Sequence, residues 1–454
     1  MNYIDYFESI KNKTIAVVGI GVSNKPLIQM LLSYGIKVSA FDKNAEKKDL
    51  IAELNSMGVE TVFGDDYLEH FNHDIIFKSP GIRDDIPQFI EAKAKGSIVT
   101  SEMEVFFELC PCEIFAVTGS DGKTTTTTLI YEILNEQGYK CHLGGNIGKP
   151  LLPEIANISK EDKVILELSS FQLKTIKKSP HISVITNLSP NHLDWHKDMD
   201  EYLDSKKNIF RFQNESDFFV TNADNEITRE LYSEARGKVR NFSRLRGDTD
   251  LHLDDGCIYY GDSKIVDTVE ILLPGVHNVE NYMAAIGAVI DYVEIDTIRK
   301  VATTFAKIPH RIEFIRELSG VKYYNDSIAS SPTRSIAGLK SFKNKVILIA
   351  GGYDKNLDYD ILGPVICEKV KKLVLVGKTS DKIEASTKKC KNYNSDDLEI
   401  IKCSAFDEAL YCAKNGAKPG DIIILSPASA SFDMFDNFEQ RGNVFKDLVN
   451  GLME

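Results

Sequence analysis

The chain has 454 residues, of which 43% are hydrophobic and 27% charged, as in an ordinary globular protein. At roughly 150 residues per domain, this length predicts about three domains. No apolar run approaches the ~20 residues that a transmembrane helix needs. The N-terminal text MNYIDYFESIKNKT lacks the cationic and apolar segments of a signal peptide, so we expect a cytoplasmic protein.

The charged residues give a net charge of −13, from 54 Lys and Arg against 67 Asp and Glu. Such a chain repels a polyphosphate backbone unless a basic stripe opposes the charge, and the sequence contains no such stripe. We therefore expect neither nucleic acid nor a membrane as a partner. A small anion can still bind locally, at a helix N-terminus beside a few lysines.

The eight cysteines are scattered along the chain. The close pair Cys110 and Cys112 has the spacing CxC, which matches neither a CxxC redox motif nor a zinc ribbon. We expect reduced, buried thiols.

The first hundred residues alternate short β-branched runs with amphipathic stretches. Strands are predicted at 14–21, 37–42 and 74–81, and a helix is predicted at 26–34. Strands that alternate with helices predict a parallel sheet.

Two further series follow. In the first, strands are predicted at 113–119, 163–170, 182–189 and 217–224, helices at 123–137 and 277–293, and edge hairpins between about 238 and 272. In the second, which opens after Pro309, strands are predicted at 321–327, 345–352, 371–377 and 421–427, with a closing helix near 441–452. Each series predicts another α/β domain.

The text AVTGSDGKTTTTTLI runs from a hydrophobic strand through a glycine-containing loop into a helix. Glycines such as Gly119 and Gly122 let backbone N–H groups turn toward phosphates, and the helix N-terminus adds a positive dipole. Lys123 would reach the terminal phosphates, and the Thr124 hydroxyl would ligate Mg²⁺. The spacing departs from GxxxxGK[ST], because Val117 stands five residues before Gly122. The text nevertheless predicts a phosphate cradle.

Two chemically active side chains follow neighbouring predicted strands. Glu167 ends the strand KVILE, and His192 follows the strand ISVITN. The carboxyl ends of parallel strands share one edge, where open α/β sheets bind ligands. Together the two predict Mg²⁺ ligation or orientation of a γ-phosphate, although each alone also fits a surface or core residue. His196 lies four residues after His192, and a zinc site would need both on one helix face.

The text GIGVSN at 19–24 begins like a dinucleotide-binding turn, and Asp42 ends the next strand as a ribose-binding acid would. Asn24 stands where a third glycine is usual. This stretch alone fits a nucleotide-diphosphate site and a packing turn equally well. The text SPG at 79–81, at the end of another strand, favours the ligand site.

Together these motifs resemble those of the ATP-dependent Mur ligases, over essentially the whole chain. The shared texts are TGSDGKTT, GGNIG (144–148), ELSSFQL (167–173), NHLDWH (191–196), HNVEN (277–281) and PHRIE (309–313). The C-terminal text LSPASASFDMFDNFEQRGNVF (425–445) is similar to the branch of the family that uses D-glutamate. The resemblance implies three α/β domains: a Rossmann-like UDP-sugar domain at 1–101, a central P-loop-type ATP domain with a parallel sheet at 102–307, and a C-terminal Rossmann-like amino-acid domain at 308–454.

The resemblance also implies roles for individual residues. The catalytic residues would be Lys123, Glu167, His192 and Lys206, and the metal ligands Thr124, Glu167, His192 and Lys206, with Lys206 carbamylated. Because Lys207 is its neighbour, the carbamylated lysine could be assigned to either of these two positions, and we assign it to Lys206. ATP would contact Gly119, Ser120, Asp121, Gly122, Lys123, Thr124, Thr125, Asn281, Arg311 and Asp326. The UDP-sugar would contact Ser23, Asp42, Ser79 and Asn146, and D-glutamate would contact Lys355, Ser431 and Phe438.

One position departs from the family, because NDSIAS has Ile328 where NDSKAT has a lysine. The acidic amino acid then meets fewer cations. We expect Lys355 and donors around Ser431 and Phe438 to bind its carboxylates instead. Without the resemblance, Asp326 and Ser327 would be interpreted as a turn and Lys355 as a solvated loop lysine.

The implied activity is phosphorylation of the carboxylate of UDP-N-acetylmuramoyl-L-alanine by ATP, followed by attack of the D-glutamate amine, in peptidoglycan precursor synthesis. A carboxylate is a poor acyl donor, and the acyl phosphate supplies a better leaving group. ATP and Mg²⁺ are the implied cofactors, and we expect a monomer.

Two alternatives remain at this stage. One is a Mur-type ligase for another substrate, such as folylpolyglutamate synthase or the ligase for the third stem residue, which the C-terminal text and the UDP-type first domain disfavour. The other is a nucleotide-sensing or assembly protein that binds ATP without ligation, which the joint presence of Glu167, His192 and Lys206 disfavours.

Overall fold

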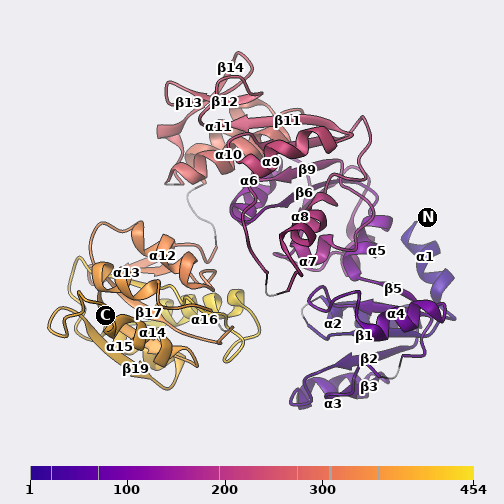
Figure 1. Ribbon diagram of the computed structural model, residues 1–454, viewed down its shortest axis with the longest axis horizontal. Coiled ribbons are helices and arrows are strands. Elements are labelled where there is room, and N and C mark those ends of the chain that lie inside the picture. The colour runs from indigo at the N-terminus through magenta and orange to yellow at the C-terminus, as the bar shows by residue number, and fades with distance from the viewer. Residues whose placement is uncertain are drawn as a thin grey trace. The chain divides into compact units, whose positions relative to one another are not determined.

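The computed structural model describes residues 2–21, 23–69, 71–193, 195–273, 275–305, 309–355 and 357–453. The chain divides into two compact units, unit 1 (residues 1–305) with two sheets and unit 2 (residues 306–454) with one. Three helix-flanked sheets confirm the predicted α/β class (Figure 1). The boundaries expected at 101/102 and 307/308 stay predictions, and the second lies outside the described residues.

The first sheet of unit 1 is parallel throughout, with strand order β3-β2-β1-β4-β5. Its strands are β1 (Ile15–Val18), β2 (Val38–Asp42), β3 (Glu60–Phe63), β4 (Ile75–Lys78) and β5 (Ile98–Thr100). Its helices are α1 (Tyr3–Ile10), α2 (Asn24–Ser33), α3 (Lys48–Ser56) and α4 (Pro87–Ala94). The predicted helix begins two residues before Pro26, because proline is tolerated in the first turn of a helix.

The central sheet of unit 1 has the order β14-β13-β12-β11-β10-β9-β6-β8-β7. Its strands are β6 (Glu113–Thr118), β7 (Cys141–Gly145), β8 (Lys163–Glu167), β9 (Ile182–Ile185), β10 (Phe218–Asn222), β11 (Lys238–Ser243), β12 (Leu251–Asp254), β13 (Cys257–Tyr260) and β14 (Ser263–Asp267). Its helices are α5 (Glu102–Leu109), α6 (Lys123–Gln137), η1 (Leu152–Asn157), α7 (Ser170–Leu173), α8 (Met199–Lys207), α9 (Glu226–Glu230), η2 (Leu231–Glu234), η3 (Thr268–Glu270), α10 (Val276–Val289) and α11 (Ile295–Thr304).

The prediction of hairpins across 238–272 is correct only for its second half. β12, β13 and β14 pair antiparallel at the edge of the sheet, as predicted for the text CIYYGDSKIV (Figure 1). β11, however, pairs parallel with β10, and β12 pairs parallel with β11. The short helices α9 and η2 make a crossover between β10 and β11, and a crossover returns the chain in the parallel direction.

The sheet of unit 2 has the order β15-β16-β20-β17-β18-β19, and only the β15–β16 pair is antiparallel. Its strands are β15 (Glu313–Leu318), β16 (Val321–Asn325), β17 (Val346–Ala350), β18 (Val370–Val376), β19 (Glu399–Cys403) and β20 (Ile422–Leu425). Its helices are α12 (Pro332–Lys340), α13 (Leu362–Lys369), α14 (Ser380–Lys388), α15 (Phe406–Lys414) and α16 (Phe438–Gly451). No helix among the described residues of the chain is long and apolar enough to span a membrane.

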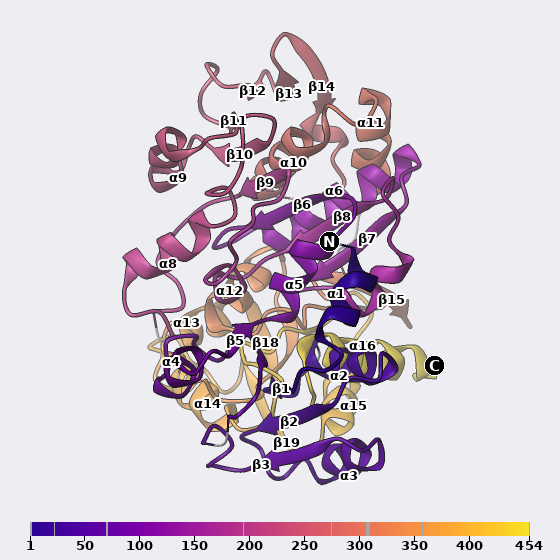
Figure 2. The same ribbon diagram turned by 90° about the vertical axis from the view of Figure 1, so that its right-hand side faces the viewer.

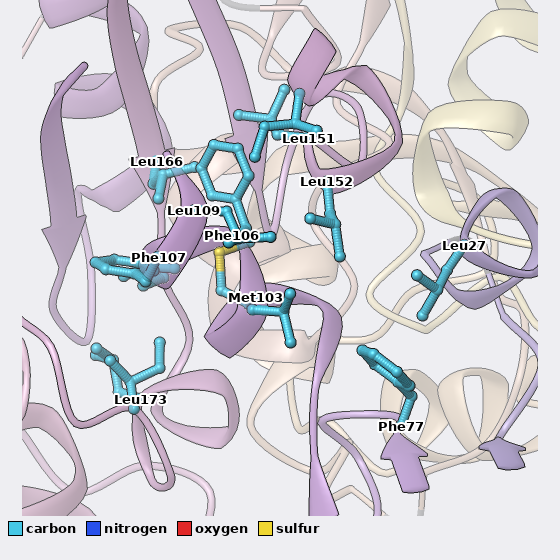
Figure 3. Close-up of a cluster of buried hydrophobic side chains, with 14 of the residues drawn as sticks. Leu27, Phe77, Met103, Phe106, Phe107, Leu109, Leu151, Leu152, Leu166 and Leu173 are labelled. Carbon is cyan, nitrogen blue, oxygen red and sulfur yellow. The ribbon is translucent and has the colours of Figure 1, made fainter. Parts of the chain in front are cut away.

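One hydrophobic core joins the two sheets of unit 1 through α5 (Figure 3). Leu27 and Phe77 belong to the first sheet layer, Phe106 belongs to α5, and Leu152 and Leu166 belong to the central layer. These side chains are fully buried. The two sheets of unit 1 therefore share one core with α5.

We expect Phe106→Ala to destabilise unit 1 strongly, because the truncation leaves a cavity in this core. Replacing a buried phenylalanine by alanine typically costs about 3–5 kcal/mol. The midpoint of thermal unfolding should fall by several degrees, whereas Val269→Ala, at a position 91% exposed, should leave it unchanged. Equal midpoints for the two variants would contradict this assignment of the core.

Candidate active site

A glycine-containing loop joins β6 to α6, as expected for a phosphate cradle. Gly119 and Gly122 have φ values of 151° and 79°. A Cβ atom on Gly119 would overlap the Thr186 hydroxyl, and one on Gly122 would overlap the Asn281 side chain, so both positions require glycine. α6 begins directly after the loop, at Lys123. The N-terminus of α6, with its positive dipole, therefore points at the loop, as predicted for a phosphate cradle.

The residues between the glycines anchor this loop to the sheet. The buried Ser120 hydroxyl lies 2.9 Å from the hydroxyl of Tyr202 on α8. Asp121 and Asn187, which follows β9, form two hydrogen bonds. The N–H of Asp121 donates to Asn187 Oδ1, and Asn187 Nδ2 donates to the Asp121 carbonyl. Lys123 Nζ donates to two loop carbonyl oxygens at 2.9 and 3.0 Å. The loop is thus held in shape by its neighbours.

Glu167 is the centre of the site, at the carboxyl end of β8. Its Oε2 accepts from the Thr124 hydroxyl at 2.7 Å, and its Oε1 accepts from Asn146 Nδ2 at 2.8 Å. Gly145 comes so close to the backbone of Glu167 that a Cβ atom there would overlap it. β6, β8 and β7 are parallel neighbours, so their carboxyl ends meet here (Figure 2). The structure thereby brings together Thr124, Glu167 and Asn146.

These oxygen atoms fit the requirements of a magnesium ion. Mg²⁺ prefers hard oxygen ligands, usually one or two protein groups together with water and phosphate oxygens. The Thr124 hydroxyl and the Glu167 carboxylate supply such oxygens directly beside the phosphate loop. Thr125 and Asn281, predicted to contact ATP, are buried on α6 and α10.

Lys206 is buried beneath the phosphate loop, with 2% of its surface exposed. Its Nζ donates to Thr118 Oγ1 and to the Gly119 carbonyl, each at 2.9 Å. Burial, reinforced by the charge of Lys123, lowers the pKa of Lys206 well below its usual value, although Glu167 opposes this. Lys207 instead forms an ion pair with Glu234 at 2.6 Å. Of the two candidate lysines, only Lys206 therefore lies at the loop.

His192 lies in the loop between β9 and α8, with a φ of 55°, an exposed side chain and its ring 5.0 Å from that of Phe171. His196 is buried, with Nε2 2.9 Å from Ser170 Oγ. Neither histidine belongs to a group of three or more possible metal ligands among the described residues. The zinc interpretation of these two histidines has no support in the structure.

An arginine that the sequence did not single out holds this histidine loop. Arg83 donates to the Trp195 carbonyl at 2.7 Å and to Glu201 at 2.7 Å, and its guanidinium lies 5.0 Å from the Trp195 ring centre. Arg83 also holds the pKa of Glu201 at about 2. Arg83 follows β4 in the first sheet layer, so it joins the two sheet layers of unit 1. Its only sequence signal is the charged text IRDD after SPG.

Three of the four residues predicted to bind the UDP-sugar follow strands of the first sheet: Ser23 follows β1, Asp42 ends β2 and Ser79 follows β4, whereas Asn146 follows β7 of the central sheet. Asp42 accepts from the N–H of Ile20 at 2.7 Å and pairs with Lys47 at 3.0 Å. Ser79 packs so closely on Gly19 that a Cβ atom there would overlap it. Ser23 is the N-cap of α2. Their predicted ligand contacts remain predictions.

Asp326, at the end of β16 in unit 2, is buried and accepts from the Ser426 hydroxyl at 2.8 Å. Burial raises the pKa of Asp326 to about 7, partly opposed by Ser426 and by the charge of Arg311. Arg311 itself is half-buried. A protonated carboxyl at this position donates a hydrogen bond, which an ionised one cannot.

Arg441, whose role the sequence did not predict, organises the C-terminal block, which is the text at 425–445 together with the residues it contacts. Arg441 is 1% exposed and donates to the Ser327 carbonyl and hydroxyl and to the carbonyls of Ser429 and Ala430, all at 2.9–3.1 Å. Burial lowers the pKa of Arg441 to about 10. These bonds fix the backbone next to Ser431.

Two of the residues predicted to bind D-glutamate, Ser431 and Phe438, lie within the C-terminal text at 425–445. Ser431 is buried, Phe438 begins α16, and Lys355 Nζ lies 5.2 Å from the ring centre of the exposed Phe432. Ile328 is half-buried and donates its N–H to the His310 carbonyl. Lys355 therefore lies beside the C-terminal block.

Family models match three separate parts of the chain. They are described as Mur ligase MurD-like, N-terminal domain (residues 13–101), Mur ligase middle domain (117–289) and Mur ligase, glutamate ligase domain (310–429). The three matched segments follow the three sheets.

Similar proteins extend over the whole chain. The UDP-N-acetylmuramoylalanine–D-glutamate ligase of Acetivibrio thermocellus is 56% identical over 458 residues, 99% of this chain and 98% of its own. The ligase of the same name from Clostridium kluyveri is 52% identical over 457 residues, 99% of each chain. The solved UDP-N-acetylmuramate-alanine ligase of Thermotoga maritima shares the fold, with a TM-score of 0.63 and 19% identity over 96% of this chain and 100% of its own.

We expect Asp326 to make the stability of unit 2 depend on pH. The folded state keeps this proton up to a pH of about 7, whereas the unfolded chain loses it near pH 4. The free energy of unfolding should therefore fall as pH rises between these values, by up to about 4 kcal/mol, and level off above them. Unfolding midpoints at about pH 5 and about pH 8 measure this effect. Asp326→Asn should flatten the slope and the exposed Asp360→Asn should keep it, and an unchanged slope in Asp326→Asn would refute the assignment.

Proposed function

The chain belongs to the Mur ligase family, and on that premise we propose that it is an ATP-dependent ligase that joins D-glutamate to UDP-N-acetylmuramoyl-L-alanine. The observation that carries the proposal is the meeting of Thr124, Glu167 and the phosphate loop at one edge of the central sheet. The D-glutamate specificity rests on the full-length relatives. From these two substrates, ATP and a UDP-linked sugar, we infer that the enzyme acts in the cytoplasm.

The first step transfers the γ-phosphate of ATP. A carboxylate oxygen of the UDP-sugar forms a bond to phosphorus, and the bond between phosphorus and the departing ADP oxygen breaks. The loop N–H groups, the N-terminus of α6 and Lys123 bind the phosphate oxygens and stabilise their charge. Thr124 and Glu167 would hold Mg²⁺, which would supply further neutralisation of charge on the phosphates.

In the second step, the neutral amine of D-glutamate forms a bond to the acyl carbon, the bond from that carbon to the phosphate oxygen breaks, and the departing phosphate carries away one amine proton. The amine must be deprotonated to attack, and D-glutamate carries two carboxylates that need cationic or N–H partners. Lys355 and the donors around Ser431 and Phe438 hold these carboxylates, and Ile328 adds no charge. Asp42, Ser79 and Ser23 hold the UDP end of the other substrate, and Asn146 orients its acyl end.

We also assign a carbamate to Lys206. A buried amine of lowered pKa is a free nucleophile that can attack CO₂, forming an N–C bond and releasing one proton. The product is an anion, which removes the repulsion between Lys206 and Lys123 and supplies oxygen atoms suited to Mg²⁺. His192, on the adjoining loop, serves the same phosphate and metal site.

Phosphate release measured with purified full-length protein tests the function. ATP, Mg²⁺, UDP-N-acetylmuramoyl-L-alanine and D-glutamate together should give steady release, and omission of either acceptor should abolish steady turnover. Release that ignores D-glutamate, or that responds to another amino acid instead, would overturn the proposal. Lys123→Ala serves as the inactive control.

We expect Lys206→Ala to lower turnover by at least about 100-fold, on the scale of losing one stabilising group at a reacting centre. Because the missing group is a carboxylate, added acetate or formate should restore part of the rate. Lys207→Ala, its neighbour in the chain, should retain full activity. Thermal unfolding of Lys206→Met, which keeps the length of the side chain, separates loss of chemistry from loss of fold. Full activity in Lys206→Ala would contradict the carbamate.

We expect Lys355→Ala to raise the KM for D-glutamate at least tenfold and to leave the KM for ATP unchanged. Loss of one partner of a desolvated carboxylate costs about 2–5 kcal/mol. Steady-state kinetics that vary each substrate separately measure the two constants. Lys389→Ala, at an exposed lysine of the same unit, is the control. Equal rises in both KM values would assign Lys355 to another role.

A further inference from the structure

Three side chains of unit 2 gather where β19 ends and α15 begins. Cys403 is the last residue of β19, and Glu408 and Cys412 lie on α15. Residues four apart on a helix share one face, so Glu408 and Cys412 point to the same side. One ligand atom from each of the three side chains lies within 4.8 Å of the other two. Within the described part of the chain, no other group of three or more His, Cys, Asp or Glu meets this spacing.

The Glu408 carboxylate is held in place by hydrogen bonds at the N-terminus of its own helix, α15. Glu408 Oε2 accepts from the N–H and hydroxyl of Ser404 at 2.8 and 2.9 Å, and from the N–H of Ala405 at 3.4 Å. These bonds hold the pKa of Glu408 below its usual range, so its side chain is an anion at neutral pH. Groups that orient a ligand in this way are typical of protein metal sites.

The cysteines are reduced and half-buried, and Glu408 is exposed, so an ion can reach the cluster from solvent. The cluster thus offers two thiols and one carboxylate to the same space.

We propose that Cys403, Glu408 and Cys412 bind a divalent cation of the zinc class, with water as the fourth ligand. Two sulfur atoms and one oxygen atom match the preferences of Zn²⁺, with bonds of about 2.3 Å to sulfur and about 2.0–2.2 Å to oxygen. Binding replaces two S–H bonds with two metal–sulfur bonds and releases two protons. Mg²⁺ avoids thiolates, so this site does not compete for the ion of the phosphate site.

Two other cysteine pairs provide matched controls. Cys110 and Cys112 have their Sγ atoms 3.8 Å apart, and Cys367 interacts with Cys390. Neither pair is part of a group of three possible ligands among the described residues. If a pair of thiols alone were enough to bind the cation, these pairs would bind it equally well.

The test uses reduced, chelator-treated full-length protein in excess Mg²⁺ and ATP, which keeps the added metal away from the phosphate site. Titration with Zn²⁺ against a competing metal-binding dye should give one tight equivalent. Co²⁺ in its place should give thiolate-to-metal charge-transfer absorption. Cys412→Ser and Cys403→Ser should remove both signals, Glu408→Gln should weaken the affinity by roughly 10–100-fold, and Cys367→Ser should change nothing.

Two results would overturn the proposal. The first is the absence of a tight equivalent in the wild-type protein. The second is an equivalent that survives in Cys403→Ser and Cys412→Ser, or that is lost in Cys367→Ser. Thermal unfolding of each variant without metal shows that the fold is intact before its affinity is compared.

Discussion

The site depends on one carboxylate, Glu167, which binds Thr124 and Asn146 at the same time. Thr124 opens the helix after the phosphate loop, and Asn146 follows the next strand of the sheet. Because β6, β8 and β7 are parallel neighbours, their carboxyl ends present these three side chains at one edge. Glu167 therefore joins the helix after the loop to the turn at Asn146, so the sheet supplies the position and this carboxylate supplies the connection.

Burial of positive charge around this edge is the second constraint. Lys206 lies under the loop, and no ion pair joins it to a carboxylate among the residues that the structure describes. A cation so placed would repel Lys123 and any metal ion nearby, which is why a neutral or modified amine fits better. Arg441 shows the contrasting solution in unit 2, where carbonyl and hydroxyl oxygens surround a guanidinium that stays charged.

Local patterns predicted much of this. The helix predicted from Lys123 to about Gln137 matches α6, because the glycine-containing loop ending GKTT marks its start. The position of Glu167 beside the loop followed from the rule that the carboxyl ends of parallel strands share one edge. The roles of Arg83 and Arg441 could not be predicted, because each also bonds a residue more than a hundred positions away, Glu201 and Ser327 respectively, and such pairs leave no periodic signal. The choice between Lys206 and Lys207, and the parallel direction of β11, likewise depend on tertiary packing.

We propose that Thr124 and Glu167 hold the metal that serves ATP. Crystals grown with Mn²⁺, a hard cation that stands in for Mg²⁺, and a non-hydrolysable ATP analogue would locate that metal by its anomalous scattering. We expect a peak within roughly 2.0–2.3 Å of the Thr124 hydroxyl or a Glu167 carboxylate oxygen, and beside the β- and γ-phosphates. A metal bound to the phosphates that contacts neither side chain would contradict it.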